Sequence, residues 1–261
     1  MLLGIIQFIT LVFIIASFIL QMLVLLGNFP GLRSVYISRV DLVPVEGSTN
    51  VFVESIKELL FTSIPDYLTL SILRICEGYN KDPSKNMCSP PSLGFQYSST
   101  EELLGTIESQ IPPSLHSRLA GIQGGVFIVS VILCFLLLCY YVFHIFAERR
   151  RLLGWCWIFL CLILTALTLL FAAATFGIQM YINSLIKSSL SDIQASFLGS
   201  LFSEFVQLVI KTGASVWFSL VSLILLFLVF VLLCISMCCI NRTRRRDTAQ
   251  TTNNQPEMSS V

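Results

Sequence analysis

Four long apolar stretches divide the chain, and each is long enough to cross a membrane. A helix needs roughly 20 mostly apolar residues to span the hydrocarbon core. The four stretches are residues 1–27, 124–146, 153–180 and 214–240. None of them contains Asp, Glu, Lys or Arg. Charged side chains within a span usually serve transport or sensing, so this pattern argues against a pump, a proton relay or a voltage sensor.

The first stretch is interpreted as a signal anchor. It has no basic segment before its apolar run, the run is longer than the core of a typical signal peptide, and Gly27 offers a poor cleavage context. A cleaved signal peptide is the alternative. Cleavage would leave three spans and place the N-terminus outside.

Composition supports a membrane protein. The chain has 261 residues, of which 55% are hydrophobic and 12% charged, and its mean hydropathy is +0.83. A soluble domain is usually about a quarter charged. The formal net charge of +1 does not indicate a nucleic-acid partner.

Arginine clusters predict the orientation. Three arginines lie in the short loop 147–152, and four follow the last span directly. They are Arg149, Arg150, Arg151, Arg242, Arg244, Arg245 and Arg246. Because basic residues near span ends stay in the cytoplasm, both termini are expected inside, with residues 28–121 and 183–213 outside. The same arginines are candidates for contact with anionic lipid.

The long outer loop, residues 28–121, has the pattern of a small α+β domain. Strands are expected where β-branched residues alternate with polar ones, and helices where apolar residues recur every three or four positions. The expected strands are 34–42, 67–75 and 94–97, the expected helices 51–61 and 100–111, and the expected loop 81–91. Pro112 and Pro113 are expected to end the second helix, and 114–119 to lead into the second span. The fold class is therefore an all-α transmembrane four-helix bundle with a small extracellular α+β domain.

The second outer segment, residues 183–213, is amphipathic. Its apolar residues recur at helical spacing: Ile186, Leu190, Ile193, Phe197, Leu201, Phe205 and Leu208. Such a helix can lie in the membrane interface. The alternative is a helical extension that packs against the protein's own outer domain.

Nine cysteines divide into seven in or beside the spans and two outside. Cys76 and Cys88 share the outer loop, and two cysteines in an oxidising compartment predict one disulfide. The alternative is a pair of free thiols or a metal pair, which lacks further ligands nearby. Cys238 and Cys239 end the last span beside the arginines, a common context for palmitoylation. The alternative is that they are ordinary apolar span residues.

Few residues of the sequence indicate a catalytic site. The two histidines, His116 and His144, are expected on opposite sides of the membrane, and no catalytic or nucleotide-binding motif appears. We therefore expect neither an enzyme nor a cofactor or metal site. The tail, residues 241–261, is expected to be disordered. Its last residues, 259–261, weakly match a C-terminal carboxylate-capture pattern.

Three segments of the outer loop resemble those of one known family. Residues 67–76 are similar to a family segment that ends in Gly-Leu-Trp-x-x-Cys, although Ser71, Ile72 and Leu73 replace Gly, Leu and Trp. Residues 88–95 resemble its Cys-Ser-x-Pro stretch, and 36–42 resemble its short strand ending in Asp. On these segments and the span order, the chain resembles the fungal claudin-like four-span family that groups eisosome-associated Sur-type proteins with the pH-response regulator PalI.

The resemblance implies a non-enzymatic organiser of the plasma membrane, acting in eisosome-type compartments and supporting cell-wall integrity and stress response. Its partners would be the lipid bilayer, neighbouring membrane proteins or copies of itself, and cortical or cell-wall components. One alternative is a PalI-like subunit of a pH-sensing complex. Another is a claudin-like regulator of calcium influx, for which we expect a polar or acidic pore lining that the four spans do not show.

Overall fold

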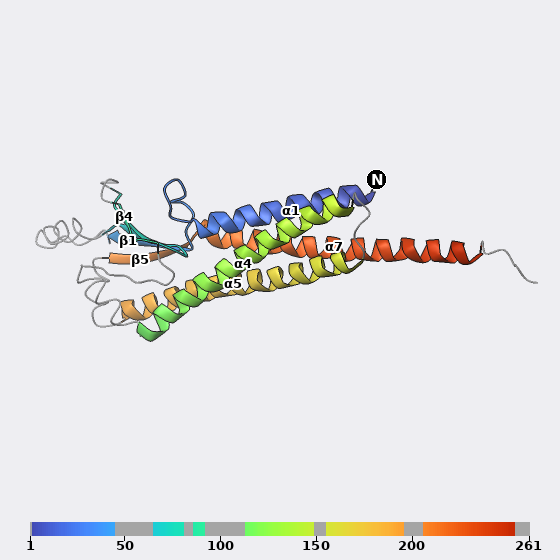
Figure 1. Cartoon of the computed structure of the whole chain (residues 1–261). Coiled ribbons are helices and arrows are strands. Elements are labelled where there is room, and N and C mark those ends of the chain that lie inside the picture. Colours follow the sequence, from blue (N-terminus) through green and yellow to red (C-terminus); the bar gives the residue numbers. More distant parts are fainter. Residues whose placement is uncertain are drawn as a thin grey trace, which may run out of the picture.

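The computed structural model describes residues 2–44, 65–80, 86–91, 113–148, 155–195 and 206–253. The helices among these residues are α1 (Leu2–Leu25), α4 (Pro113–Glu148), α5 (Trp155–Ala195) and α7 (Ala214–Asn253). They lie side by side in one elongated bundle, with a β-sheet at one end (Figure 1). We call this the sheet end. The opposite end, where the N-terminus lies and α7 projects beyond the other helices, is the basic end.

All four helices contain a segment long and apolar enough to cross a membrane. These segments are Gly4–Leu25, Gly121–Phe146, Trp157–Leu185 and Ala214–Cys238. They coincide with the four apolar stretches of the sequence. The prediction of a four-span bundle is therefore confirmed.

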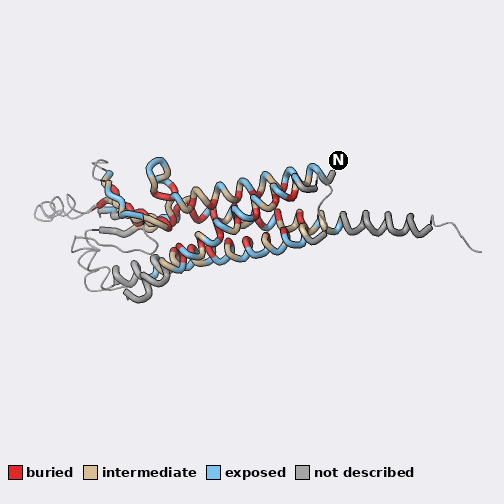
Figure 2. The backbone as a smooth tube through the Cα atoms, in the orientation of Figure 1, coloured by how far each residue is buried: buried red, intermediate tan, exposed pale blue. Residues whose placement is uncertain are grey.

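The helices pack through buried positions that alternate at spacings of three and four residues. Along α4 these are Gln123, Phe127, Ser130, Cys134, Leu137, Tyr141 and His144. Along α7 they are Ser215, Ser219, Ser222, Leu226, Val229 and Leu233. This spacing is typical of helices that cross at a shallow angle, as in coiled coils. α1 packs on α7 and α4, and α5 packs on the same two helices, so the buried positions line one shared interior (Figure 2).

The sheet has five antiparallel strands in the order β4-β3-β2-β1-β5. They are β1 (Ser38–Pro44), β2 (Tyr67–Leu70), β3 (Ile75–Gly78), β4 (Met87–Cys88) and β5 (Val206–Thr212). Four strands come from the long outer loop, and β5 comes from the second loop. Both loops therefore contribute to one sheet, although strands were expected only in the first.

Backbone hydrogen bonds join the sheet to the helices. The amide of Gly213 donates to the Ile37 carbonyl (2.8 Å), and the amide of Ser215 donates to the Tyr36 carbonyl (3.1 Å). A Cβ on Gly213 would lie 1.9 Å from the Tyr36 oxygen. Only glycine permits this close approach, so the first turn of α7 is held against the segment that enters β1.

Several boundaries differ from the sequence predictions in the first loop. The strand expected at 34–42 begins at Ser38, because a turn closed by the hydrogen bond from the Val35 amide to the Leu32 carbonyl (3.0 Å) precedes it. The strand expected at 67–75 is a hairpin of β2 and β3, reversed where the Ser71 amide donates to the Arg74 carbonyl (2.9 Å). The expected loop 81–91 contains the short strand β4.

The lead-in expected at 114–119 is helical. α4 begins at Pro113, although Pro113 was expected to end the preceding helix. Proline suits the first turn of a helix because its fixed backbone angle is already helical and its missing amide hydrogen has no partner there in any case.

The second outer segment is only partly helical. α5 continues as far as Ala195, but Val206–Thr212 forms β5, so a helix over 183–213 was wrong for this part. β5 reads Val-Gln-Leu-Val-Ile-Lys-Thr, and β-branched residues favour an extended strand. The open edge of β1 supplies backbone partners along the whole of β5.

The tail prediction was also wrong for residues 241–253. α7 continues through Arg242 to Asn253 without a Gly or Pro to stop it. Helix propagation costs much less than nucleation, and the span has already nucleated this helix. Predictions for 51–61, 94–97, 100–111 and 254–261 lie outside the described residues.

Candidate functional site

A disulfide links β3 and β4, the last two strands at the β4 edge of the sheet. Cys76 of β3 and Cys88 of β4 are directly paired in the ladder, and their sulfur atoms are 2.07 Å apart. Cys76 is buried and Cys88 is exposed. The predicted disulfide is therefore confirmed, and it fixes the two-residue strand β4, which is too short to be stable by itself.

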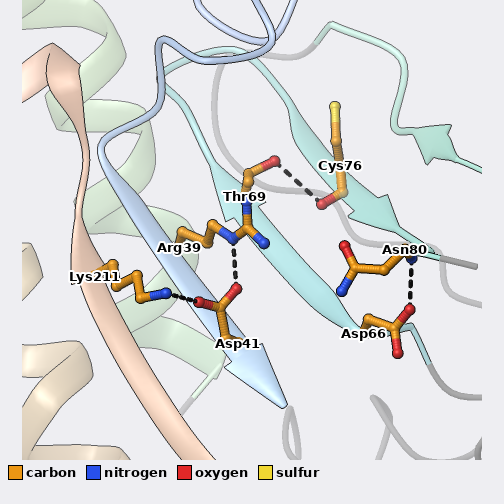
Figure 3. Close-up of polar contacts among 7 residues, drawn as sticks. All are labelled: Arg39, Asp41, Asp66, Thr69, Cys76, Asn80 and Lys211. Carbon is orange, nitrogen blue, oxygen red and sulfur yellow. Dashed lines mark hydrogen bonds and ion pairs between the residues drawn. The ribbon is translucent and has the colours of Figure 1, made fainter. Parts of the chain in front are cut away.

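An ion-pair clamp joins the two outer loops at the opposite edge of the sheet. The Asp41 carboxylate of β1 forms two ion pairs. Its Oδ1 lies 2.5 Å from Nε of Arg39, and its Oδ2 lies 2.8 Å from Nζ of Lys211. Arg39 lies two residues away on the same face of β1, and Lys211 lies diagonally across on β5 (Figure 3). We call Arg39, Asp41 and Lys211 the sheet clamp. The Asp41 side chain is only 11% exposed, whereas the Lys211 side chain is 62% exposed.

The sheet clamp keeps Asp41 ionised. Burial raises the pKa of the Asp41 carboxyl, but hydrogen bonds from Lys211 and Arg39 and the charges of both groups outweigh this effect. The pKa therefore lies below its ordinary value of 3.8. At neutral pH the clamp is a charged network with two cations around one carboxylate.

An aromatic side chain extends the clamp across the sheet. The Arg39 guanidinium carbon lies 3.9 Å from the centre of the Tyr67 ring, a cation–π contact. The ring in turn covers Gly78, its ladder partner on β3, where a Cβ would lie 1.9 Å from a ring carbon. Arg39, Tyr67 and Gly78 thus form a continuous contact across β1, β2 and β3.

The sheet is also attached to the end of α1. Asn28 follows this helix with a positive φ of 64°, a conformation that asparagine tolerates better than most residues. Its buried side-chain amide donates to the Thr69 carbonyl on β2 (3.3 Å). Arg74, in the turn between β2 and β3, lies 4.3 Å over the Phe29 ring. The sheet therefore rests on α1 and α7 together.

The bundle interior is more polar than the sequence predicted. Buried Ser, Thr, Gln and Asn side chains lie on all four helices, most of them in the half nearer the sheet. We call Ser17, Gln21, Gln179, Ser219 and Ser222 the polar belt. The expectation that the spans show no polar lining is therefore wrong for neutral residues. The signal was present, because these residues occupy the same three-and-four repeat as the apolar core.

Part of the polar belt is hydrogen-bonded between α1 and α7. The hydroxyls of Ser17 and Ser222 lie 2.7 Å apart, and the Gln21 amide nitrogen donates to the Ser222 hydroxyl at 3.2 Å. Hydrogen bonds between helices help to hold membrane bundles together. This network fixes the register of α1 against α7.

The arginines after the last span and the cysteines beside them lie at the basic end. Arg242, Arg244, Arg245 and Arg246 lie on the part of α7 that extends beyond the span, whereas Arg149, Arg150 and Arg151 lie outside the described residues. Cys238 is exposed at the last position of the span. The backbone of Cys239 continues the same helix. His144 is buried on α4, towards the basic end.

The described residues contain no group of three or more His, Cys, Asp or Glu placed to hold a metal ion. What the arrangement offers is a cross-linked sheet attached to a membrane bundle, with a basic helix at the other end.

Comparison with known proteins gives the family. No curated protein matches the chain. The model of the SUR7/PalI family matches residues 6–197. This match covers most of α1 and all of the first four strands, α4 and α5, which is more than half of the chain. On this match and on its four-span architecture, the protein belongs to the SUR7/PalI family.

Proposed function

We propose that this protein is a claudin-like organiser of the plasma membrane, which associates laterally with its neighbours through the extracytoplasmic sheet. It would act in eisosome-type compartments and support cell-wall integrity and stress response. The observation that carries the proposal is the sheet itself. Both loops build it, a disulfide and an ion-pair clamp cross-link it, and backbone hydrogen bonds attach it to the bundle.

A cross-linked sheet of this kind is suited to binding because its surface is preorganised. An interface made by a flexible loop loses conformational entropy on association, whereas a prefolded surface avoids much of that cost. Apolar side chains such as Phe8, Phe135 and Leu170 are exposed on the bundle, where they would contact lipid or a neighbouring span. The protein would therefore be held in the bilayer by its helices and make specific contacts through its sheet.

The orientation belongs to the same proposal. The arginines after the last span, and Arg149, Arg150 and Arg151 between α4 and α5, would face the cytoplasm and contact anionic lipid or cortical proteins. Cys238 and Cys239 would be acylated beside them. Reporter fusions or impermeant labelling at residue 150 and at the C-terminus would test this. Labelling of either site from outside intact cells would contradict the orientation.

Localisation tests the function. A C-terminally tagged copy is imaged in a fungal cell beside an eisosome marker, together with the variants Lys211→Met and Lys187→Met. The two substitutions remove the same charge from exposed lysines near the sheet end, but only Lys211 belongs to the sheet clamp. Stable patches that overlap the marker, and that weaken with Lys211→Met alone, are expected.

Two other outcomes favour other functions. Diffuse, endosomal or pH-dependent localisation would replace the organiser role with a PalI-like subunit of a pH-sensing complex. Calcium influx that depends on the polar belt, lost in Gln21→Leu while patches persist, would favour the claudin-like calcium role. The uncharged side chains of the polar belt are the feature that makes the calcium role worth testing.

A further inference from the structure

The polar belt brings polar groups of three helices to within about one helical turn of each other in depth. Asn183 of α5 donates to the Thr212 hydroxyl (3.0 Å), two residues before α7 begins. Gln179 lies four residues further into the bundle on α5, and Ser219 lies five residues into α7. At about 1.5 Å of rise per residue, Gln179 lies roughly 6 Å and Ser219 roughly 10 Å beyond the Asn183–Thr212 contact. α5 packs against α7, so Gln179 and Ser219 lie within about one helical turn of each other in depth.

Gln21 of α1 lies close to Ser219 in depth. Its amide nitrogen bonds to Ser222, which lies one turn along α7 from Ser219 on the same buried face. α1 packs against α7 on its other flank. Gln21, Gln179 and Ser219 are 4%, 0% and 9% exposed, so all three side chains belong to the interior.

Within the described part of the chain, several polar atoms of the belt have no protein partner. They are both amide atoms of Gln179, the amide oxygen of Gln21 and the hydroxyl of Ser219. The neighbouring threonines of α5 differ, because Thr168 and Thr175 each donate to the carbonyl four residues earlier. An unpaired buried polar group costs about 1–3 kcal/mol, and buried polar groups nearly always have a partner. The unsatisfied atoms therefore call for a ligand.

Apolar clusters flank the belt on α1 and α7. On the sheet side lie Val24 and Val216, packed with Ile37 and Ile72 of the sheet-end segments. On the basic side lie Ile14 and Leu226, in a cluster that also contains Leu137, Cys161 and Val229. The belt is thus separated from both ends of the bundle along these two helices.

The chemistry of the unpaired atoms indicates which ligand fits the polar belt. They include both a donor and acceptors, and the spans provide no carboxylate to neutralise a cation. A charge at this depth would be costly, whereas a water molecule can donate and accept at once and typically bridges two to four buried polar groups. We propose that the polar belt is an internal hydration site, in which water links Gln179 of α5 to Gln21 and Ser219 across the bundle.

The direct test compares two cysteines on one face of α7. Ser222→Cys places a thiol in the belt, and Leu226→Cys places one four residues further, in the apolar cluster. The native side chains are equally buried, at 1% and 0% exposure. In nanodiscs transferred to deuterated buffer, infrared difference spectra against the unsubstituted protein report S–H exchange. Exchange at Ser222→Cys is expected on the order of tenfold faster or more. Equal rates would overturn the proposal.

A stability measurement tests the same site independently. If water pairs with Gln179, Gln179→Leu removes hydrogen bonds and lowers the Tm. If the site is dry, the same substitution removes two unpaired polar atoms and raises the Tm. Thr175→Val, four residues away on the same face of α5, is the matched control because its hydroxyl bonds only within its own helix. An unchanged or raised Tm for Gln179→Leu would contradict the hydration site.

Discussion

Lys211 forms an ion pair with Asp41, with Nζ and Oδ2 2.8 Å apart. The two residues lie in different loops at the sheet end, separated in the chain by α4 and α5. Their contact exists only because β5 pairs with β1 over its full length. It therefore reports whether the second loop has joined the sheet.

Asp41→Asn is expected to destabilise the sheet more than Lys211→Met. The Asp41 side chain is nearly buried between two cations, so its loss leaves Arg39 without its carboxylate and should cost about 1–3 kcal/mol. Lys211 is mostly exposed, and exposed pairs contribute about 0–1 kcal/mol. Thermal unfolding in detergent, followed by limited proteolysis of the loops, measures both. A larger effect from Lys211→Met would contradict the assigned geometry.

Acid should weaken the sheet through the same carboxylate. Because the pKa of folded Asp41 lies below its unfolded value of 3.8, its stabilisation is fully present above that value and is lost as the pH falls through the lower folded value. The sheet is therefore expected to become protease-sensitive below about pH 4. Asp41→Asn should be less stable at neutral pH and should lose part of this acid dependence. An identical acid profile in both proteins would exclude Asp41 as its source.

The disulfide should stabilise the sheet edge. The cysteines are 12 residues apart, and closing a loop of this size contributes about 3 kcal/mol in the chain-entropy model. Cys76→Ser should cost more than Cys88→Ser, because Cys76 is buried, whereas Cys88 is exposed and its serine hydroxyl would stay in water. Proteolysis with and without reductant checks both effects. A reductant effect that persists in the double serine variant would point to another cause.

Gly78→Ala should disrupt the pairing of β2 with β3. The new methyl group would overlap the Tyr67 ring, and relieving this overlap should cost about 1–3 kcal/mol. Tyr67→Ser removes the ring and should partly rescue Gly78→Ala, although it also removes the contact with Arg39. A double-mutant cycle of unfolding free energies measures the coupling. Additive effects would show that the ring does not occupy this position.

The prediction of the sheet was limited by short strands and long-range pairing. Residues 67–75 are uniformly rich in Leu and Ile and gave no sign of the reversal at 71–74, which depends on backbone contacts such as the bond from Ser71 to Arg74. Residues 206–212 fit both a helical repeat and a strand. The free edge of β1 decided between them, and that edge lies far away in the sequence.

Hydrophobicity alone determined the number and the approximate positions of the spans, because the bilayer demands about 20 apolar residues whatever their partners. The cysteine count and the topology also determined the disulfide, since only Cys76 and Cys88 fall in an outer loop. Tertiary structure decided the contacts between segments far apart in the sequence. These are the sheet clamp of Asp41 with Lys211, the packing of the start of α7 against Tyr36, and the hydrogen bond of Gln21 with Ser222. These features depend on packing between segments that are remote in the chain, and a local pattern of residues carries no information on which remote groups will meet.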